Sequence, residues 1–493
     1  MVGFYQLSLF VYRLFFHPLR SVPGPWYAAI SDLWISYHTI SFDLCHAIES
    51  QVKKYGPVRI APNRVMFVDG PTNKIVYPKF DKHSAYLSLR LDGNNAAITI
   101  LDTVEHARVR RASSGQYVTS NIGKSLVSST TQSRTYFHLE KYEPDILESI
   151  FPLVQRLQDE KGKNPFDCLI MLRHLMTEIL VRTNFDLESD AVKIWASGGI
   201  DPLTAAVHDT PKYQTVEFNL PHWAWKIVSY IPHPAWQRIV ASPKVLTDFV
   251  CQGLQQTKQD AKAGKFDDAE RVPLVARILA SNLDDQLKQG ESADHLLAGI
   301  DTVATTLSYF CWGLACHPHV IQKLRSELDE VMHDQASIPK IQTLKTLPYL
   351  TAVIQESLRL YGTAPTYLPR IVPSARTLNI LGYEIPPGTV IGTSSWSTHR
   401  QEDIYPSAET FNPDRWLAPN VIDKSQMIAF GYGGRSCAGE NLAQMVLRII
   451  VVTFVRYFDI ELPKDRKLDM WMCDGFAGFP AGQEVPLVFK PRF

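Results

Sequence analysis

A glycine-rich loop near the end of the chain constrains the fold more than any other stretch. It reads F-G-Y-G-G-R-S-C-A-G over 430–439 and runs into an apolar periodic segment over 442–450. That periodicity predicts a buried helix. Cys437 would then stand close to the helix start, where the positive end of the helix dipole and unpaired N–H groups favour a thiolate over a thiol.

The other residues of this loop indicate a flat, anionic ligand. The glycines at 431, 433 and 439 remove side chains that would clash with it, and they permit backbone angles that other residues avoid. Arg435 can pair with a carboxylate on the ligand, and Phe430 can shield the sulfur from water. One anionic sulfur beneath a large planar group suggests haem ligated by cysteine. The alternative is a structural loop that holds a buried cysteine.

The pattern F-G-x-G-x-R-x-C-x-G resembles the haem-binding loop of the cytochrome P-450 monooxygenases, and every fixed position is filled. The resemblance implies a mainly α fold with small β-sheets, the cytochrome P-450 fold. It also implies haem b (iron protoporphyrin IX) as cofactor, with Cys437 as the metal ligand and Phe430, Arg435 and Gly439 in the cofactor-binding loop.

Bulk composition excludes some classes of protein. The 493 residues hold 50 basic and 50 acidic side chains, so nothing favours nucleic acid as a partner. The seven cysteines are odd in number and contain no CxxC spacing, which argues against a disulfide framework and against a zinc site. Such a cysteine pattern favours a reducing compartment.

The N-terminus is apolar and aromatic from Val2 to Phe16, and a hinge of prolines follows at 18, 23 and 25. A bilayer span needs about 20 apolar residues, so this segment is short for a transmembrane helix. It resembles the end of the membrane anchor of microsomal family members. We therefore expect a membrane-anchor segment at 1–17 and a catalytic domain at 18–493, with an ordinary buried N-terminal segment as the alternative.

A basic helical segment follows in which His106 and Arg110 are four residues apart and share one face. By itself this spacing is typical of a solvated helix face, but the family uses it to hold a haem propionate. Arg370, after Pro369, resembles the strand arginine that meets a propionate. The polar run at 125–135 is expected to be a loop insertion without an assigned role.

The sequence A-G-I-D-T over 298–302 lies inside a long apolar helical pattern from about 294 to 315. Gly299 costs about 1 kcal/mol relative to alanine in a helix interior, so its placement needs a reason. The family's A-G-x-D-T element is fully matched, and there a glycine kink makes room for dioxygen. By resemblance, Thr302 donates a hydrogen bond and Asp301 supplies protons. A threonine bonded back to its own helix is the alternative.

Glu356 and Arg359 lie three residues apart on a predicted helix. Alone they would be a surface ion pair. The family places an arginine of a second element, here Arg415 in F-N-P-D-R-W over 411–416, against that pair to form a buried triad. Because buried charges need such mutual satisfaction, we expect these three residues to be structural.

Four motifs in the family's order imply an NADPH- and oxygen-dependent monooxygenase acting on a hydrophobic small molecule. The chain resembles fungal secondary-metabolism members. Because it has no flavin or nicotinamide fingerprint, we expect a separate NADPH-cytochrome P-450 reductase, at the endoplasmic reticulum membrane with the catalytic domain on the cytosolic side. The alternatives are isomerase, dehydratase or peroxygenase chemistry at the same site, or a non-catalytic haem-binding protein.

Overall fold

The computed structural model describes the chain except for small gaps and one longer one. The described residues are 2–114, 139–267, 271–332, 334, 337–375, 377–417, 419, 422–423, 425–475 and 477–493. The polar run at 125–135 lies outside the described residues. Helices make up most of the fold and the sheets are small, so the predicted fold class is confirmed.

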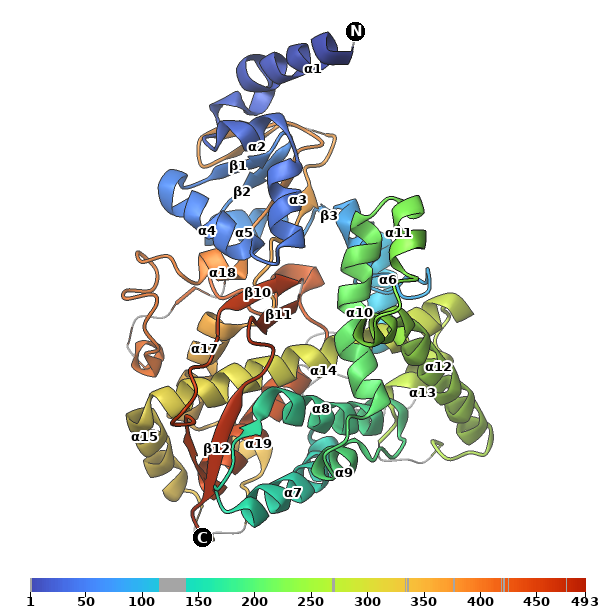
Figure 1. The fold of residues 1–493 in the computed structure, drawn as a ribbon, viewed down its shortest axis with the longest axis vertical. Helices are drawn as coiled ribbons and strands as arrows, with labels where there is room; N and C mark the ends of the chain where they lie inside the picture. The colour runs from blue at the N-terminus through green and yellow to red at the C-terminus, as the bar shows by residue number, and fades with distance from the viewer. Residues whose placement is uncertain are drawn as a thin grey trace, which may run out of the picture.

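Helix α14 (Asp285–Cys316) crosses the middle of the molecule (Figure 1). Asp284 caps its start, since its carboxylate accepts a hydrogen bond from the Leu287 N–H at 2.8 Å. Its apolar side chains pack mainly against α8 (Cys168–Phe185), a helix buried over almost its whole length. A helix that is apolar on nearly all sides belongs in the core of a large protein.

Three more helices surround this pair and carry parts of the site. Helix α19 (Glu440–Tyr457) follows the glycine-rich loop, α17 (Pro348–Tyr361) carries Glu356 and Arg359, and α6 (Thr103–Ser114) carries His106 and Arg110. The largest hydrophobic cluster of buried side chains joins α7, α8, α14, α17 and α19 into one core. This core holds the predicted site motifs in fixed positions relative to one another.

The remaining helices have the following bounds: α1 Val2–Val11, α2 Trp26–Ile30, α3 Leu33–Ile40, α4 Leu44–Tyr55, α5 Gly70–Val76, α7 Glu143–Glu160, α9 Ala191–Ala196, α10 Pro202–Asn219, α11 His222–Val228, α12 Pro234–Lys262, α13 Leu274–Ala280, α15 Pro318–Asp329, α16 Ile341–Leu344 and α18 Ser395–Thr398. Within the described residues, no helix combines the length and the apolar character that a membrane span requires.

The largest sheet has the strand order β1-β2-β8-β5-β3. Strands β1 (Val58–Ala61) and β2 (Arg64–Met66) form an antiparallel hairpin, with Arg59 opposite Val65. Strand β8 (Val390–Gly392) runs parallel to β2, and β5 (Arg370–Ile371) joins it to β3 (Asp81–Lys82). This order places Arg370 beside Lys82 at one edge of the sheet.

The smaller sheets lie toward the C-terminus. Their strands are β4 Phe166–Asp167, β12 Pro486–Pro491 and β9 Phe458–Glu461 in one sheet, with β10 Met472–Gly475 and β11 Ala477–Pro480 in a hairpin and β6 Leu378–Ile380 and β7 Tyr383–Ile385 in another.

Candidate functional site

The glycine-rich loop folds back on itself before α19 begins. The Cys437 N–H donates to the Phe430 carbonyl at 2.7 Å, which closes the loop. Gly431 and Gly433 have φ angles of 74° and 77°, so both need the backbone freedom of glycine. Gly439 has a φ of −84°, and the expectation that it too needs an unusual backbone angle is wrong. A Cβ on Gly439 would point into open space, so its missing side chain can serve only a ligand.

Cys437 lies deep within the molecule, yet its side chain is exposed, which means that the sulfur faces an internal space. Burial raises the pKa of the Cys437 thiol, while the Gly439 N–H and the charge of Arg110 act in the opposite direction. Burial wins this comparison. The helix start therefore does not ionise this cysteine by itself, contrary to the expectation from the sequence, and a bound metal ion would have to stabilise the thiolate.

Five basic side chains gather on one side of this space: Lys82, His106, Arg110, Arg370 and Arg435. They come from β3, α6, β5 and the glycine-rich loop. Burial, together with the charges of the other four, lowers the pKa of His106 to about 3. Burial and the neighbouring Arg370 lower the pKa of Arg435 to about 10. Such mutual repulsion indicates that this cluster needs an anion.

Two guanidinium nitrogens in this cluster have no hydrogen-bonding partner among the residues that the structure describes. Arg435 uses Nη2 to donate to the Leu101 carbonyl and to Thr103 Oγ1, both at 2.8 Å, but its buried Nη1 is unpartnered. Arg370 donates from Nη1 to the Tyr86 hydroxyl at 2.8 Å, and its buried Nε is unpartnered. Buried donors of this kind are costly when they stay unsatisfied, so an anionic ligand fits here.

Helix α14 presents one face to the same internal space. Ala298 is exposed although its neighbours Leu296 and Ile300 are fully buried. Thr302, one turn later, is partly exposed and its hydroxyl donates to the Ala298 carbonyl at 2.6 Å. The hydroxyl hydrogen is thus committed to the helix, as in the alternative stated above. The hydroxyl oxygen remains able to accept a hydrogen bond from a ligand.

Helix α14 is continuous from Asp285 to Cys316, so the helix is not broken at Gly299, where the resemblance implies a kink. Gly299 instead allows close contact between helices. A Cβ at this position would lie 2.5 Å from Cδ1 of the buried Leu180 on α8. The cost of a glycine inside a helix is therefore offset by the packing of α8 against α14.

Asp301 points away from the internal space, into contacts with α8 and α10. Its Oδ1 lies 2.5 Å from Nε of Arg173, and its Oδ2 lies 3.7 Å from Nδ1 of His208. Burial would raise the pKa of Asp301, but the charge of Arg173 and the contact with His208 outweigh it and hold the pKa well below its usual range. His208 in turn contacts Lys212, whose Nζ lies 2.7 Å from His208 Nε2. The Lys212 side chain is partly exposed.

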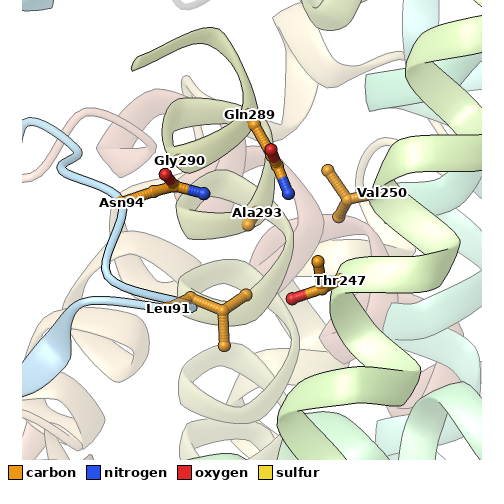
Figure 2. A pocket seen from close by; sticks show the side chains of 7 residues that line it. All are labelled: Leu91, Asn94, Thr247, Val250, Gln289, Gly290 and Ala293. Atoms are coloured by element: carbon orange, nitrogen blue, oxygen red, sulfur yellow. The ribbon is translucent and has the colours of Figure 1, made fainter. Parts of the chain in front are cut away.

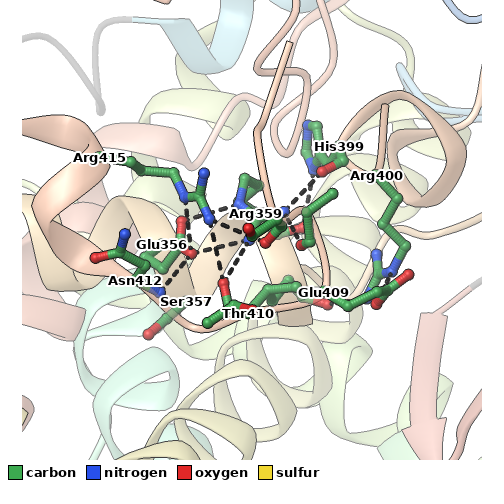
Figure 3. Close-up of polar contacts among 12 residues, drawn as sticks. Glu356, Ser357, Arg359, His399, Arg400, Glu409, Thr410, Asn412 and Arg415 are labelled. Carbon is green, nitrogen blue, oxygen red and sulfur yellow. Dashed lines mark hydrogen bonds and ion pairs between the residues drawn. The ribbon is translucent and has the colours of Figure 1, made fainter. Parts of the chain in front are cut away.

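Glu356, Arg359 and Arg415 meet in a buried network (Figure 3). Glu356 Oε1 lies 2.8 Å from Arg359 Nη2 and 3.1 Å from Arg415 Nε, and both Glu356 and Arg359 are completely buried. The remaining Glu356 lone pairs accept hydrogen bonds from the Asn412 N–H at 2.8 Å and from Trp416 Nε1 at 2.9 Å. The structure thus brings together the three residues predicted to form a triad.

His399 connects this network to the glycine-rich loop. Its Nε2 accepts from the Ile428 N–H at 3.0 Å, so its Nδ1 carries the hydrogen and donates to the Arg359 carbonyl at 3.1 Å. The Arg359 guanidinium returns a bond of 2.7 Å to the His399 carbonyl. Burial and the two neighbouring arginines lower the pKa of His399 to about 3, which keeps the ring neutral. The loop is therefore fixed to the C-terminal end of α17.

A cavity of about 440 Å³ opens beside the basic cluster. Its lining includes Tyr86, whose hydroxyl meets Arg370, and it combines apolar side chains with hydroxyl groups from α3, the segment 83–89, the end of α10 and the segment 366–369. A volume of this size suits a small organic molecule.

These residues fit the haem that the sequence resemblance implies. The Cys437 sulfur faces the internal space, Gly439 leaves room beside it, and Ala298 forms a small, open wall opposite. The unpartnered nitrogens of Arg370 and Arg435 match the propionates of a haem. Arg110 lies close enough for its charge to act on His106, whose neutral ring can still hydrogen-bond to a propionate.

Sequence reasoning did not find Lys82, Arg173, His208 or the role of His399. No local pattern marks them, because each acts through a partner far away in the sequence: Arg173 is 128 residues from Asp301. Asn412 and Trp416 belong to the motif over 411–416, but that motif did not predict their hydrogen bonds to Glu356. A buried acid in a helix does require a cationic partner, yet that requirement does not say which one.

Comparison with known proteins gives a consistent result. The family model described as "Cytochrome P450" matches residues 122–482. Cytochrome P450 monooxygenase orf2 of Aspergillus niger is 24% identical, over 99% of this chain and 94% of that protein. Tryprostatin B 6-hydroxylase of Aspergillus fumigatus is 26% identical, over 100% of this chain and 84% of that protein. Cytochrome P450 monooxygenase AMT3 of Alternaria alternata is 26% identical, over 97% of this chain and 95% of that protein.

Proposed function

The chain belongs to the cytochrome P450 family, and from that premise we propose that it is a haem-thiolate monooxygenase of fungal secondary metabolism. It uses haem b to transfer one oxygen atom from dioxygen to a hydrophobic small molecule. The relatives named above are fungal cytochrome P450 monooxygenases or a hydroxylase. One observation carries the proposal: a cysteine sulfur faces an internal space bordered by a basic cluster in which guanidinium nitrogens of Arg370 and Arg435 have no hydrogen-bonding partner among the described residues.

The residues of this chain divide the work by position. Cys437 would supply the sulfur ligand, and Arg370, Arg435, His106 and Arg110 would hold the propionates. Bound haem would supply the site at which dioxygen is reduced with two electrons from the reductase and two protons, so that one oxygen atom goes to the substrate and the other to water. The hydroxyl oxygen of Thr302 accepts a hydrogen bond from a proton donor in the internal space and thereby orients that donor.

Asp301 serves proton supply indirectly. Its carboxylate is ionised and anchored by Arg173, so the next proton carrier along its contacts is His208, followed by Lys212 toward the surface. Burial and the charge of Arg173 lower the pKa of His208, so its ring is largely neutral. A neutral imidazole has one donor and one acceptor nitrogen and can relay a proton between Lys212 and Asp301.

Electrons come from a separate NADPH-cytochrome P-450 reductase, and the protein lies at the endoplasmic reticulum membrane with its catalytic domain on the cytosolic side. Exposed aromatic side chains support a membrane-facing surface. On α1 and the turn that follows, Phe4 is 79% and Phe16 67% exposed, and on the α11 segment Trp223 is 69% and Tyr230 82% exposed. Amphipathic rings of this kind settle at membrane interfaces. Residues 1–17 would act as the anchor segment.

The deciding experiment is spectroscopic. The reduced, carbon monoxide-treated protein should show the long-wavelength Soret band that thiolate ligation produces, and Cys437→Ala should lose it. Cys316→Ala is the matched control, because Cys316 is an exposed cysteine at the end of α14. If Cys437→Ala kept the band, the ligand assignment would be wrong.

Oxygen uptake separates the alternatives. With a microsomal reductase, a monooxygenase consumes NADPH and oxygen together when a substrate is present. Turnover without NADPH would favour the isomerase, dehydratase or peroxygenase alternative. A normal Soret band without any turnover across a substrate panel would favour a non-catalytic haem-binding protein.

A further inference from the structure

Asp294 lies on the face of α14 that borders the internal space. It is four residues before Ala298 and eight before Thr302, so the three side chains form one stripe along the helix. Asp294 lies as deep in the protein as Cys437 does, and yet its side chain is partly exposed. The charge of Asp294 also acts on the Cys437 thiol, so the two groups are close enough to interact electrostatically.

Among the described residues, none forms a hydrogen bond or ion pair with the Asp294 carboxylate, whereas its neighbours are occupied. Glu291 accepts a hydrogen bond from the Ala97 N–H, and His295 lies 3.6 Å from Glu291 Oε2. Lys82 donates to the carbonyls of Ala97 and Ile98 at 2.8 and 2.7 Å. Within the described part of the chain, Asp294 is therefore an acid without a hydrogen-bonding partner on the partly exposed face of α14.

Another face of α14, which carries Gln289, Gly290 and Ala293, is packed tightly against the rest of the protein. Figure 2 shows Gly290 and Ala293 of α14 facing Asn94 and Leu91 of the loop, with Val250 of α12 alongside. The gap between these residues leaves no room for a water molecule, and a Cβ on Gly290 would collide with the Asn95 carbonyl. That face of α14 therefore leaves no room for a ligand, whereas the face that carries Asp294, Ala298 and Thr302 is partly exposed.

The electrostatic surroundings of Asp294 are mixed. Burial and the charge of Glu291 raise its pKa to about 6, while His295, Lys82 and Arg110 act in the opposite direction. At neutral pH the carboxylate is ionised but poorly solvated, a condition that a cationic partner relieves.

We propose that Asp294 recognises a positively charged nitrogen on the substrate, so that the substrate class is a hydrophobic small molecule with a basic or quaternary amine. This rests on the proposed function, because it takes the internal space to be the substrate site. A purely apolar substrate would remove the remaining water from an ionised carboxylate without forming a hydrogen bond or an ion pair in its place. An ammonium group would form a charge-assisted contact in a site of low dielectric constant.

The test compares two probes of equal shape and different charge. Trimethyl(4-phenylbutyl)ammonium carries a cation that has no lone pair and cannot bind the haem iron. (5,5-Dimethylhexyl)benzene replaces its nitrogen by carbon. The Kd of each is measured on the haem-loaded protein by the substrate-induced absorbance change and by equilibrium dialysis. Because the two probes have the same shape, their packing contributes equally to both Kd values. The ratio of the two Kd values therefore reports the effect of the charge.

In Asp294→Asn, the Kd ratio should shift at least about tenfold against the cation, which corresponds to about 1.4 kcal/mol. Asp294→Glu should retain part of the preference, because it keeps the charge. Asp285→Asn is the matched control, since Asp285 is an exposed acid on the same helix, and it should leave the ratio unchanged.

Two results would overturn the inference. One is a Kd ratio in Asp294→Asn within twofold of the unmodified protein. The other is an equal weakening of both probes together with loss of haem, which would mean that Asp294 serves the cofactor site. Both are distinct from failure of the proposed function, because that failure appears in the unmodified protein as a missing carbon monoxide Soret band.

Discussion

The guanidinium of Arg173 on α8 lies against the carboxylate of Asp301 on α14, with Nε and Oδ1 2.5 Å apart and both side chains buried. The adjacent Thr302 is the residue that meets the internal space. Two neighbouring residues of one helix thus have different surroundings, one a protein interior with fixed charges and the other a ligand site. This separation explains how Asp301 can remain ionised close to the internal space.

The Arg173–Asp301 pair should show a large coupling energy. Arg173→Leu leaves the Asp301 charge without its main partner, and we expect a loss of about 3–5 kcal/mol in the free energy of unfolding. The double variant Arg173→Leu/Asp301→Leu should recover much of that loss, because no buried charge remains. A double-mutant cycle from urea unfolding measures the coupling.

A surface pair provides the comparison. Lys193 and Asp190 are 2.7 Å apart on the exposed face at the start of α9, and their coupling should be below about 0.5 kcal/mol. Equal coupling in both pairs would show that burial does not matter for Asp301.

Removal of Arg359 should prevent stable haem incorporation. Arg359→Ala leaves Glu356 with a reduced set of donors and frees the His399, Ala408 and Thr410 carbonyls that the guanidinium contacts. We expect about 3–5 kcal/mol of destabilisation. Haem content per protein after purification is the measurement, and Lys323→Ala, which breaks an exposed pair with Asp414, is the control that should stay within about 0.5 kcal/mol. A fully haem-loaded Arg359→Ala protein would refute the structural role.

Removal of the Thr302 hydroxyl should reduce the yield of product per NADPH more than it reduces NADPH consumption. Thr302→Val keeps the side-chain volume but removes the only hydroxyl of the stripe formed by residues 294, 298 and 302. NADPH consumption should persist, while product per NADPH falls by about tenfold or more and hydrogen peroxide rises to match. Thr302→Ser restores a hydroxyl and should restore coupling. Unchanged coupling in Thr302→Val would mean that a water molecule or the substrate performs this task.

Asp294 should make stability depend on pH. Its pKa in the folded protein is raised to about 6 from an ordinary value near 3.8, so its contribution is favourable below the ordinary pKa and is lost as pH rises through about 6. Asp294→Asn removes this loss. The variant should gain roughly 1–2 kcal/mol over the unmodified protein between pH 4.5 and pH 7.5, with little further change above pH 7.5. Urea unfolding at several pH values measures it, and a constant difference across that range would contradict the assignment.

The N-terminal segment should contribute to membrane affinity but not to folding. Deletion of residues 1–10 removes exposed apolar side chains of α1 and keeps Arg13, which donates to the Ile30 carbonyl at 2.5 Å. Vesicle binding should fall while the haem spectrum survives. Residual binding is expected from the exposed rings of α11. Loss of the folded protein on this deletion would favour a buried N-terminal segment.

Local motifs predicted the parts of the site that depend on short spacing. The loop over 430–439, the pair Glu356 and Arg359 and the helix around Thr302 all lie within single elements, and their periodicity is visible in the sequence. The partners Arg173, His208 and Lys82 could not be predicted this way, because their contacts form only when distant elements pack together. The raised pKa of Cys437 could not be predicted for the same reason. The helix start is visible in the sequence, whereas burial by distant elements is not.

The close approach of α8 and α14 at Gly299 has a consequence for the evolution of this chain. The space that a side chain at 299 would need is occupied by Leu180. The two positions therefore share one volume, and a larger residue at either site can be accepted only if the other becomes smaller. Among relatives of this protein, a residue larger than glycine at 299 should accompany a residue smaller than leucine at 180, and exchange at one position alone should be rare.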